Sequence, residues 1–258
     1  MKHFLKELKT RNAALYYFGL ANLLCAVVCL VLAQVYGIEV LGVNAFFKPA
    51  KFFLSTTIFV WTMGWLLAYL NEPRKVKVYN WVVILVFCFE NGYILFRAAR
   101  GELSHFNTSS STGIALYILM GIAITIMTLW TGYFALLFFK DPLPQLQRHY
   151  VWGIRFGLLF FVIFASAGHV MASMMHHTVG APDGGAGIPF FNWSTQHGDL
   201  RIAHFLGMHS LQLLPLMGRY VSKRSIITVL LSIVYFLLVT AVFLQALISK
   251  PLMQFYLG

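Results

Sequence analysis

Charged residues are scarce in this sequence, and acidic residues are the scarcest of them. Lys, Arg, Asp and Glu make up 10% of its 258 residues, only 8 residues are acidic, and 59% are apolar. A soluble domain carries roughly 25% charged and about 45–50% apolar residues. So little charge excludes an ordinary water-soluble domain and indicates that lipid surrounds much of the chain.

Cysteine is also rare, and it is placed where it cannot form a disulfide framework. Cys25 and Cys29 lie in the first apolar run and Cys88 lies in the third, so none stands in a polar loop. This placement excludes the class of small domains that disulfides hold together. Because Cys25 and Cys29 are four residues apart, we expect them to be small packing residues on one helix face.

Long apolar runs fill most of the chain. A helix needs about 20 apolar residues to cross a bilayer, and seven stretches qualify: about 13–36, 52–71, 80–99, 113–139, 152–175, 201–218 and 226–248. The first run lacks a following small-residue cleavage site, so we expect it to be retained as a helix. No polar stretch is long enough for a second domain. The sequence therefore predicts an all-α bundle of seven transmembrane helices in a single domain, residues 1–258.

The lysines and arginines indicate how this bundle is oriented. Most of the nineteen lie in four segments: Lys2, Lys6, Lys9 and Arg11; Arg74, Lys75 and Lys77; Lys140, Arg148 and Arg155; and Arg219, Lys223 and Arg224. With seven spans, all four segments fall on one side, which the positive-inside rule makes cytoplasmic. The N-terminus is then cytoplasmic and the C-terminus periplasmic. Since these anchors explain the net charge of +11, no nucleic-acid partner is expected.

The remaining basic residues and most histidines fall on the opposite, outer side. They are Lys48, Lys51, Arg97, Arg100, Arg201 and Lys250, with His105, His169, His176, His177, His197, His204 and His209. Ionisable residues in or beside a membrane are functional candidates, because burying them is costly. The predicted site therefore lies in the outer half of the bundle.

Glu90 is the acidic residue expected to lie deepest in the membrane. It is about ten residues below the outer end of the third span, roughly 15 Å at the helical rise. Arg97, seven residues further on, shares its helix face. A carboxylate at this depth predicts either a structural ion pair or a proton or substrate site. Glu90, Arg97 and His105 are the candidate catalytic residues.

Two histidines are placed where they could hold one haem. His169 in the fifth span and His209 in the sixth lie at similar depths, roughly 9–12 Å from the outer ends. Imidazoles from two helices can ligate a b-type haem from both faces, although histidines also simply hydrogen-bond across helices. Gly168 and Gly207 would let a flat macrocycle approach the backbone. The residues expected to bind the propionates or another anionic group are Arg97, Arg100, Arg201, Lys48 and Lys51.

A transition metal is the alternative cofactor, with ligands among His105, His169, His204 and His209. His204 and His209 are five residues apart, about 140° around a helix, so they do not share a face as the histidines of HExxH do. A zinc site would need a third ligand, such as His105, His169 or Glu102. Asp199, just before the sixth span, is expected to cap that helix.

The longest connection, about 176–200, joins the fifth and sixth spans. It is rich in Gly and Pro, which argues against regular structure. A loop of this length indicates a lid or a binding loop, whereas its aromatic residues Phe190, Phe191 and Trp193 are equally typical of an interfacial belt. Pro215 is expected to kink the sixth span and open a polar pocket there.

Three stretches of the sequence resemble a known family: NAFFKPAKF at 44–52, RGELSHFN at 100–107 and DLRIAHFLGMHSLQ at 199–212. The family consists of bacterial seven-helix inner-membrane proteins with no assigned activity, so the resemblance implies a bacterial cytoplasmic membrane and no function. The chain lacks the Ser-His-Asp-HxxxH pattern of seven-helix zinc hydrolases related to ceramidases. Its last span also has no lysine that could hold retinal.

Together these features favour a membrane redox enzyme or electron carrier that uses haem b or a transition metal. Its expected partners are membrane lipid and a quinone or an anionic small molecule. Two other hypotheses stay open: a transporter or binding protein for an anionic or lipidic ligand, and a non-catalytic assembly subunit. A redox protein should carry a stoichiometric chromophore or metal. A transporter needs a polar path inward, and the inner half of the bundle offers few polar residues.

Overall fold

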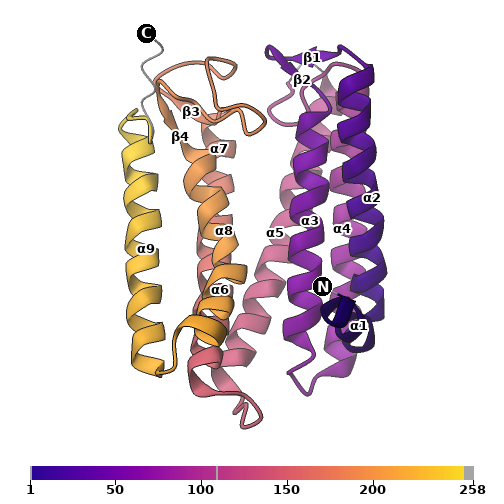
Figure 1. The fold of residues 1–258 in the computed structure, drawn as a ribbon. Coiled ribbons are helices and arrows are strands. Elements are labelled where there is room, and N and C mark those ends of the chain that lie inside the picture. The colour runs from indigo at the N-terminus through magenta and orange to yellow at the C-terminus, as the bar shows by residue number, and fades with distance from the viewer. Residues whose placement is uncertain (1, 109, 253–258) are drawn as a thin grey trace. The chain divides into compact units, whose positions relative to one another are not determined.

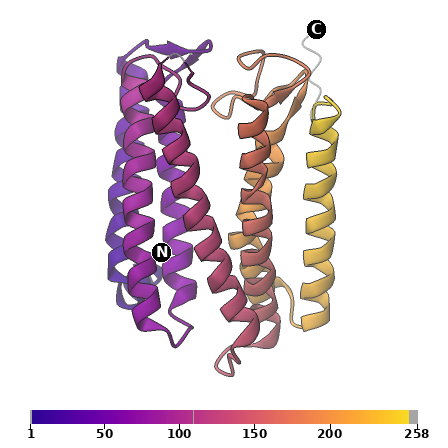
Figure 2. The same cartoon turned by 180° about the vertical axis from the view of Figure 1, so that it is seen from behind.

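The chain is helical and divides into two compact units. The computed structural model describes residues 2–108 and 110–252. The first unit is Met1–Trp130 and the second is Thr131–Gly258. Helix α5, Ser111–Lys140, begins in the first unit and ends in the second (Figures 1 and 2).

The other elements fall within one unit each. The first unit contains α1 (Lys2–Arg11), α2 (Ala13–Val35), β1 (Glu39–Val40), β2 (Val43–Asn44), α3 (Phe47–Leu67) and α4 (Pro73–Ala99). The second contains α6 (Arg148–Ala165), α7 (Ala167–Met174), β3 (Thr178–Val179), β4 (Gly198–Asp199), α8 (Leu200–Leu216), the π-helix η1 (Met217–Val221) and α9 (Ser225–Leu247).

Within the described residues, six helical runs are long and apolar enough to cross a membrane: α2, α3, α4, α5, α6 together with α7, and α9. The prediction of an all-α, multi-pass membrane protein is confirmed at this level. The predicted sixth span corresponds to α8, which has only 17 residues and rises about 25 Å. The five residues of η1 continue it without a break to Val221.

The fifth predicted span is a helix interrupted at one residue. Helix α6 ends at Ala165 and α7 begins at Ala167. Between them, the hydroxyl of Ser166 donates a hydrogen bond to the carbonyl oxygen of Ile163. A serine that bonds back to its own helix competes with the backbone hydrogen bonds there.

Two pairs of buried asparagines hold α2 and α4 together in the first unit. The amides of Asn12 and Asn80 donate to each other, at 3.2 and 3.0 Å. The Asn91 amide donates to Asn22 at 3.0 Å and to Thr56 of α3 at 3.0 Å. Polar side chains in an apolar interior pair across helices because no water is present to satisfy them. The sequence analysis did not identify this arrangement.

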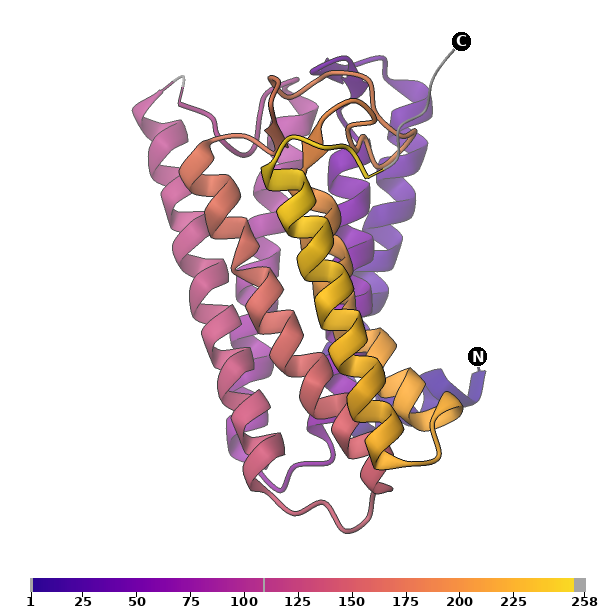
Figure 3. The ribbon, with the colours of Figure 1, turned by 90° about the vertical axis from the view of Figure 1, so that its left-hand side faces the viewer.

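Helix α1 lies across the ends of the first unit's helices (Figure 3). Leu8 is fully buried, and the ring of Phe4 stacks on Trp65 of α3 with centroids 5.1 Å apart. The guanidinium of Arg11 lies 4.1 Å from the Trp65 ring centre and pairs with Glu7. Because lysines lie on its exposed face, α1 is an amphipathic helix of the kind found at membrane surfaces.

The hairpin of the first unit is a tight turn between β1 and β2. Its two central residues, Leu41 and Gly42, both have positive φ, at 53° and 72°. Positive φ at both positions defines the type I′ turn that matches the twist of antiparallel strands. Asn44 then fixes the hairpin to the end of α2, since its amide donates to the carbonyl oxygens of Ala33 and Tyr36.

In the second unit, α6 and α8 pack unusually closely. A Cβ on Gly153 would lie 2.4 Å from the Leu214 carbonyl oxygen, and one on Gly157 would lie 2.9 Å from the Ser210 carbonyl oxygen. Small residues allow two helix backbones to approach in this way. Pro215 lies at this contact, with its Cδ 3.1 Å from the Cβ position of Gly157, and η1 follows it. Protein atoms therefore fill the side of Pro215 that faces Gly157, and the polar pocket predicted near this proline stays a prediction.

Candidate functional site

The loop of residues 175–199 folds over the start of α8 and is regular in part. Strand β3 pairs with β4, with Thr178 opposite Asp199. Asp183 holds the start of this loop: its carboxylate accepts from the backbone N–H of His177 at 3.1 Å, that of Thr178 at 2.9 Å and the His177 Nδ1 at 2.8 Å. The expectation that the segment is wholly irregular is therefore wrong, because it overlooked these local hydrogen bonds.

Asp199 is the second organising carboxylate, and its side chain is completely buried. It caps α8 as predicted, accepting from the backbone N–H of Arg201 at 3.0 Å. It also accepts from the Ser194 N–H at 2.8 Å and from Nε and Nη2 of Arg201 at 2.9 and 2.6 Å. Asp199 is thus more than a cap, since it holds both the loop and the arginine.

Glycines let the same loop touch the end of α9. A Cβ on Gly198 would lie 2.0 Å from the carbonyl oxygen of Ala246. The hydroxyl of Ser249 donates to the carbonyl oxygen of Val179 at 2.7 Å, and it would meet a Cβ on Gly180. The loop is therefore held by both α8 and α9 and forms a fixed cap on this end of the second unit.

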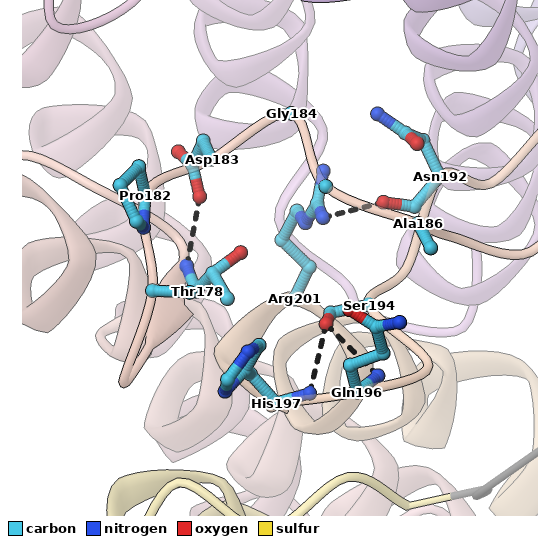
Figure 4. Close-up of a pocket in the computed structure, with 12 residues that line it drawn as sticks. Thr178, Pro182, Asp183, Gly184, Ala186, Asn192, Ser194, Gln196, His197 and Arg201 are labelled. Carbon is cyan, nitrogen blue, oxygen red and sulfur yellow. Dashed lines mark hydrogen bonds between the residues drawn. The ribbon is translucent and has the colours of Figure 1, made fainter.

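A pocket of about 300 Å³ opens within this cap. The side chain of Arg201 stands in it, with Nη2 donating to the Asn192 carbonyl oxygen at 2.6 Å (Figure 4). Gln196, His197 and the Gly184–Gly185 turn form other parts of its wall. Within the described chain, Nη1 of Arg201 and the imidazole of His197 have no hydrogen-bond partner. The pocket therefore offers hydrogen-bond donors to a small molecule.

Asp183 makes the stability of this cap pH-dependent. Burial alone would raise its pKa, but hydrogen bonds from the His177 side chain and from Thr178 hold the pKa well below that of an ordinary aspartate. A lowered folded-state pKa means that the stabilisation is complete above the unfolded pKa, about 3.9, and is lost as the pH falls below it. Asp183→Asn should lower stability by about 1–3 kcal/mol at pH 7.

The thermal unfolding midpoints of wild type and Asp183→Asn, measured between pH 7 and pH 3, check this prediction. The gap between the two proteins should be constant down to about pH 5 and shrink below about pH 4. A gap that persists unchanged at pH 3 would show that the Asp183 charge contributes nothing.

The aromatic residues of the loop pack inward on α8. The ring of Trp193 lies 4.6 Å from Phe191 and 5.3 Å from Phe205 of α8, measured between centroids. Phe205 in turn lies 4.0 Å from the ring of His209. These contacts hold the loop in place, which favours the binding-loop interpretation over an interfacial belt.

The three histidines predicted as ligands in this unit are not arranged as expected. Gly168, the residue before His169, lies beside His204 and not beside His209. The Cε1 atom of His204 is 3.6 Å from the position that a Cβ on Gly168 would take. The Phe164 ring occupies the space at Gly207. Gly207 therefore serves helix packing, whereas room for a macrocycle beside Gly168 stays a prediction.

In the first unit, Arg97 and Arg100 share one acidic partner. Both guanidinium groups bond to Glu102, and Arg97 also donates to the Tyr93 hydroxyl at 2.9 Å. The hydrogen bonds from Arg100 and Arg97 lower the pKa of Glu102. Arg97 therefore does not pair with Glu90, as the ion-pair alternative required. Glu90 is 5% exposed, and its Oε1 has no hydrogen-bond partner within the described chain.

Lys48 and His105 meet at the same end of the first unit. The Nζ of Lys48 lies 3.4 Å from Nδ1 of His105, and the Ser104 hydroxyl lies 3.1 Å from the same nitrogen. Lys51, one turn further along α3, is half-buried. The predicted residues thus form two groups, one in each unit: Lys48 with His105 in the first, and Arg201 with Asp199 in the second.

No group of three or more His, Cys, Asp and Glu side chains among residues 2–108 and 110–252 is arranged to hold a metal ion. The third ligand that a zinc site would need is thus not found in that part of the chain. A haem held by two histidines needs no third ligand, so haem stays a prediction.

Several residues of the pocket were not predicted from the sequence, chiefly Asp183, Asn192 and Gln196, and His197 was named only among the outer ionisable residues. A signal was present, since an aspartate beside a Gly-Gly pair is typical of a structured turn. Neither the protein-family models, nor the curated proteins, nor the solved structures gave a match to this chain. Its function is therefore argued from its own geometry.

Proposed function

We propose that this chain is a multi-pass membrane protein that binds a small anionic molecule in the pocket beside Arg201. One observation carries the proposal: the guanidinium is fixed by Asp199 and the Asn192 carbonyl oxygen, yet keeps Nη1 for a ligand. A charged N–H group held in one orientation suits an oxygen of a carboxylate or a phosphate, because hydrogen bonds between charged partners are the strong ones. His197 supplies a further donor, because at least one nitrogen of an imidazole ring carries a proton.

The size of the pocket limits the ligand. Its volume of about 300 Å³ equals roughly ten water molecules at about 30 Å³ each. This is room for inorganic phosphate or a short dicarboxylate. The Asp199 charge offsets that of Arg201, so we expect modest affinity, with hydrogen-bond geometry rather than net charge selecting the ligand.

The distribution of basic residues supports a role on the non-cytoplasmic face. Within each unit, the connections rich in Lys and Arg lie at one end of the helices, and the loop after α4 or after α7 lies at the other end. The positive-inside rule assigns the basic ends to the cytoplasm. We propose seven spans, with α8 and η1 forming the sixth, a cytoplasmic N-terminus and a periplasmic C-terminus. The resemblance noted in the sequence supports a bacterial inner membrane.

Calorimetric titration of the detergent-purified protein with succinate and inorganic phosphate tests the proposal. At least one should bind, and His197→Ala should weaken that binding about tenfold, the contribution of one hydrogen bond to a charged oxygen. Arg201→Gln should abolish binding. Because Arg201 also supports Asp199, the His197 variant is the cleaner measure.

His176→Ala is the matched control, since His176 lies in the same loop and does not line the pocket. It should keep the wild-type affinity. The proposal would be falsified if neither anion bound, or if the two histidine variants bound equally well.

A redox role is the second candidate, and the tautomers of two histidines favour it. Nδ1 of His204 lies 2.8 Å from the Phe164 carbonyl oxygen, and Nδ1 of His209 lies 2.7 Å from that of Phe205. A carbonyl oxygen can only accept, so both Nδ1 atoms carry a proton, and in the neutral imidazoles both Nε2 atoms keep a lone pair. Metal-binding histidines commonly have this arrangement.

The absorption spectrum and the metal content of the purified protein test this candidate function, which would use the predicted haem or metal with a quinone as partner. Stoichiometric haem or metal that His204→Ala or His209→Ala removes, and His149→Ala does not, would support it. A colourless, metal-free protein from cells supplied with both would exclude it.

A further inference from the structure

A second cluster of polar side chains lies in the first unit, where α3 and α5 begin. Lys48 comes from α3, His105 from the loop after α4 and Tyr117 from α5. An ammonium group can only donate hydrogen bonds, so in the 3.4 Å contact between the two side chains Lys48 Nζ is the donor and His105 Nδ1 is the acceptor. The ring proton of a neutral His105 is then on Nε2. Lysine and histidine therefore both present N–H groups at this end of the unit.

Tyr117 adds a hydroxyl group that the protein does not satisfy. Its ring meets the His105 ring nearly edge-on, with centroids 6.3 Å apart. Its hydroxyl oxygen is buried and has no hydrogen-bond partner within residues 2–108 and 110–252. Buried polar groups are almost always paired, so an unpaired one points to a molecule that belongs there.

The surroundings determine which kind of molecule would fit. The nearby carboxylate, Glu102, is already engaged by Arg97 and Arg100. The Lys48 ammonium places a positive charge beside His105, which in turn meets the Tyr117 ring, and this charge favours an anionic oxygen. Phe52 and Phe106 flank the cluster, with ring centroids 5.8 Å from His105 and 5.8 Å from Tyr117 respectively. Aromatic walls favour a ligand with an apolar body.

We propose that Lys48, His105 and Tyr117 form a site for the anionic oxygen, carboxylate or phosphate, of an amphiphilic molecule. The Tyr117 hydroxyl donates to that oxygen, and the Lys48 ammonium offsets its charge. The site is independent of the Arg201 pocket, which belongs to the other unit, so either proposal can fail alone.

Native mass spectrometry of the full-length protein, with counted ligand per chain, tests the site. The probes are laurate and dodecyl phosphate. Dodecanol, which lacks the charge, and acetate and inorganic phosphate, which lack the alkyl chain, are the control compounds. At least one charged amphiphile should bind, and Tyr117→Phe should weaken it about tenfold. Tyr133→Phe on the same helix is the control and should bind as the wild type does.

Stability without ligand separates a binding role from a structural one. Tyr117→Phe keeps the ring and removes only the unpaired hydroxyl, so the ligand-free variant should melt at the wild-type temperature or above. A lower midpoint would mean that the hydroxyl has a structural partner. That outcome would overturn the proposal. So would equal affinity of Tyr117→Phe and the wild type for the charged amphiphile, or binding of dodecanol, acetate or inorganic phosphate as tight as that of the charged amphiphile.

Discussion

Gly153→Ala is expected to be among the most damaging single substitutions in this protein. The new Cβ would lie 2.4 Å from the Leu214 carbonyl oxygen and 3.0 Å from its carbonyl carbon. These are backbone atoms of α8, so no side-chain rotation can relieve the clash, and the two helices must move apart. Overpacking usually costs about 1–3 kcal/mol, and a rigid backbone contact places this variant at or above the upper end. The thermal unfolding midpoint in detergent is the measurement.

Gly121→Ala is the matched control for this substitution. Gly121 also lies inside a long apolar helix, and a Cβ there would meet no atom within 4 Å. Alanine is the better helix former, by about 1 kcal/mol in a helix interior, so this variant should be neutral or slightly stabilised. Equal midpoints for the two variants would mean that α6 and α8 do not pack through Gly153.

Asp199→Asn is the other substitution with a large expected effect. The carboxylate is completely buried and accepts four hydrogen bonds, one from Ser194 and three from Arg201. Removing one partner of a buried ion pair costs about 3–5 kcal/mol, because the other charge is left uncompensated. The side chain of Arg201 is 26% exposed, which places the cost near the lower limit, about 3 kcal/mol.

A double-mutant cycle separates the ion pair from the helix cap. Asp199→Asn combined with Arg201→Met should recover part of the loss, since no unpaired charge remains. Asp141→Asn is the control, because the Asp141 side chain makes no hydrogen bond or ion pair within the described chain; it should change the midpoint little. Additive losses in the double variant would contradict a coupled Asp199–Arg201 pair.

Much of the fold was predictable from the sequence because its signals are local. An apolar run of about 20 residues identifies a membrane helix without reference to any other part of the chain. The cap at Asp199 was predicted from its position before such a run and is confirmed. The short helix α1 was not predicted from the sequence, because its apolar face is narrow and its basic residues are also explained as topology anchors.

The candidate sites were predictable only in outline. The sequence singled out Lys48, His105 and Arg201 among its outer polar residues, and their role in binding stays a prediction. The proposed pairing of Glu90 with Arg97 failed because a closer carboxylate, Glu102, follows in the next loop. Counting residues from the helix ends aligned His169 with His209, whereas His204 is the histidine of α8 that lies beside Gly168.

By itself, then, the sequence determined that this is a helical membrane protein and where its polar chemistry gathers, because hydropathy and charge act residue by residue. The tertiary structure decided which groups meet. Asn12 pairs with Asn80, 68 residues away, and Asn91 pairs with Asn22, 69 residues away. The Tyr117 hydroxyl, by contrast, finds no partner in the described chain. Such contacts depend on how helices rotate and approach one another, and a single sequence does not contain that information.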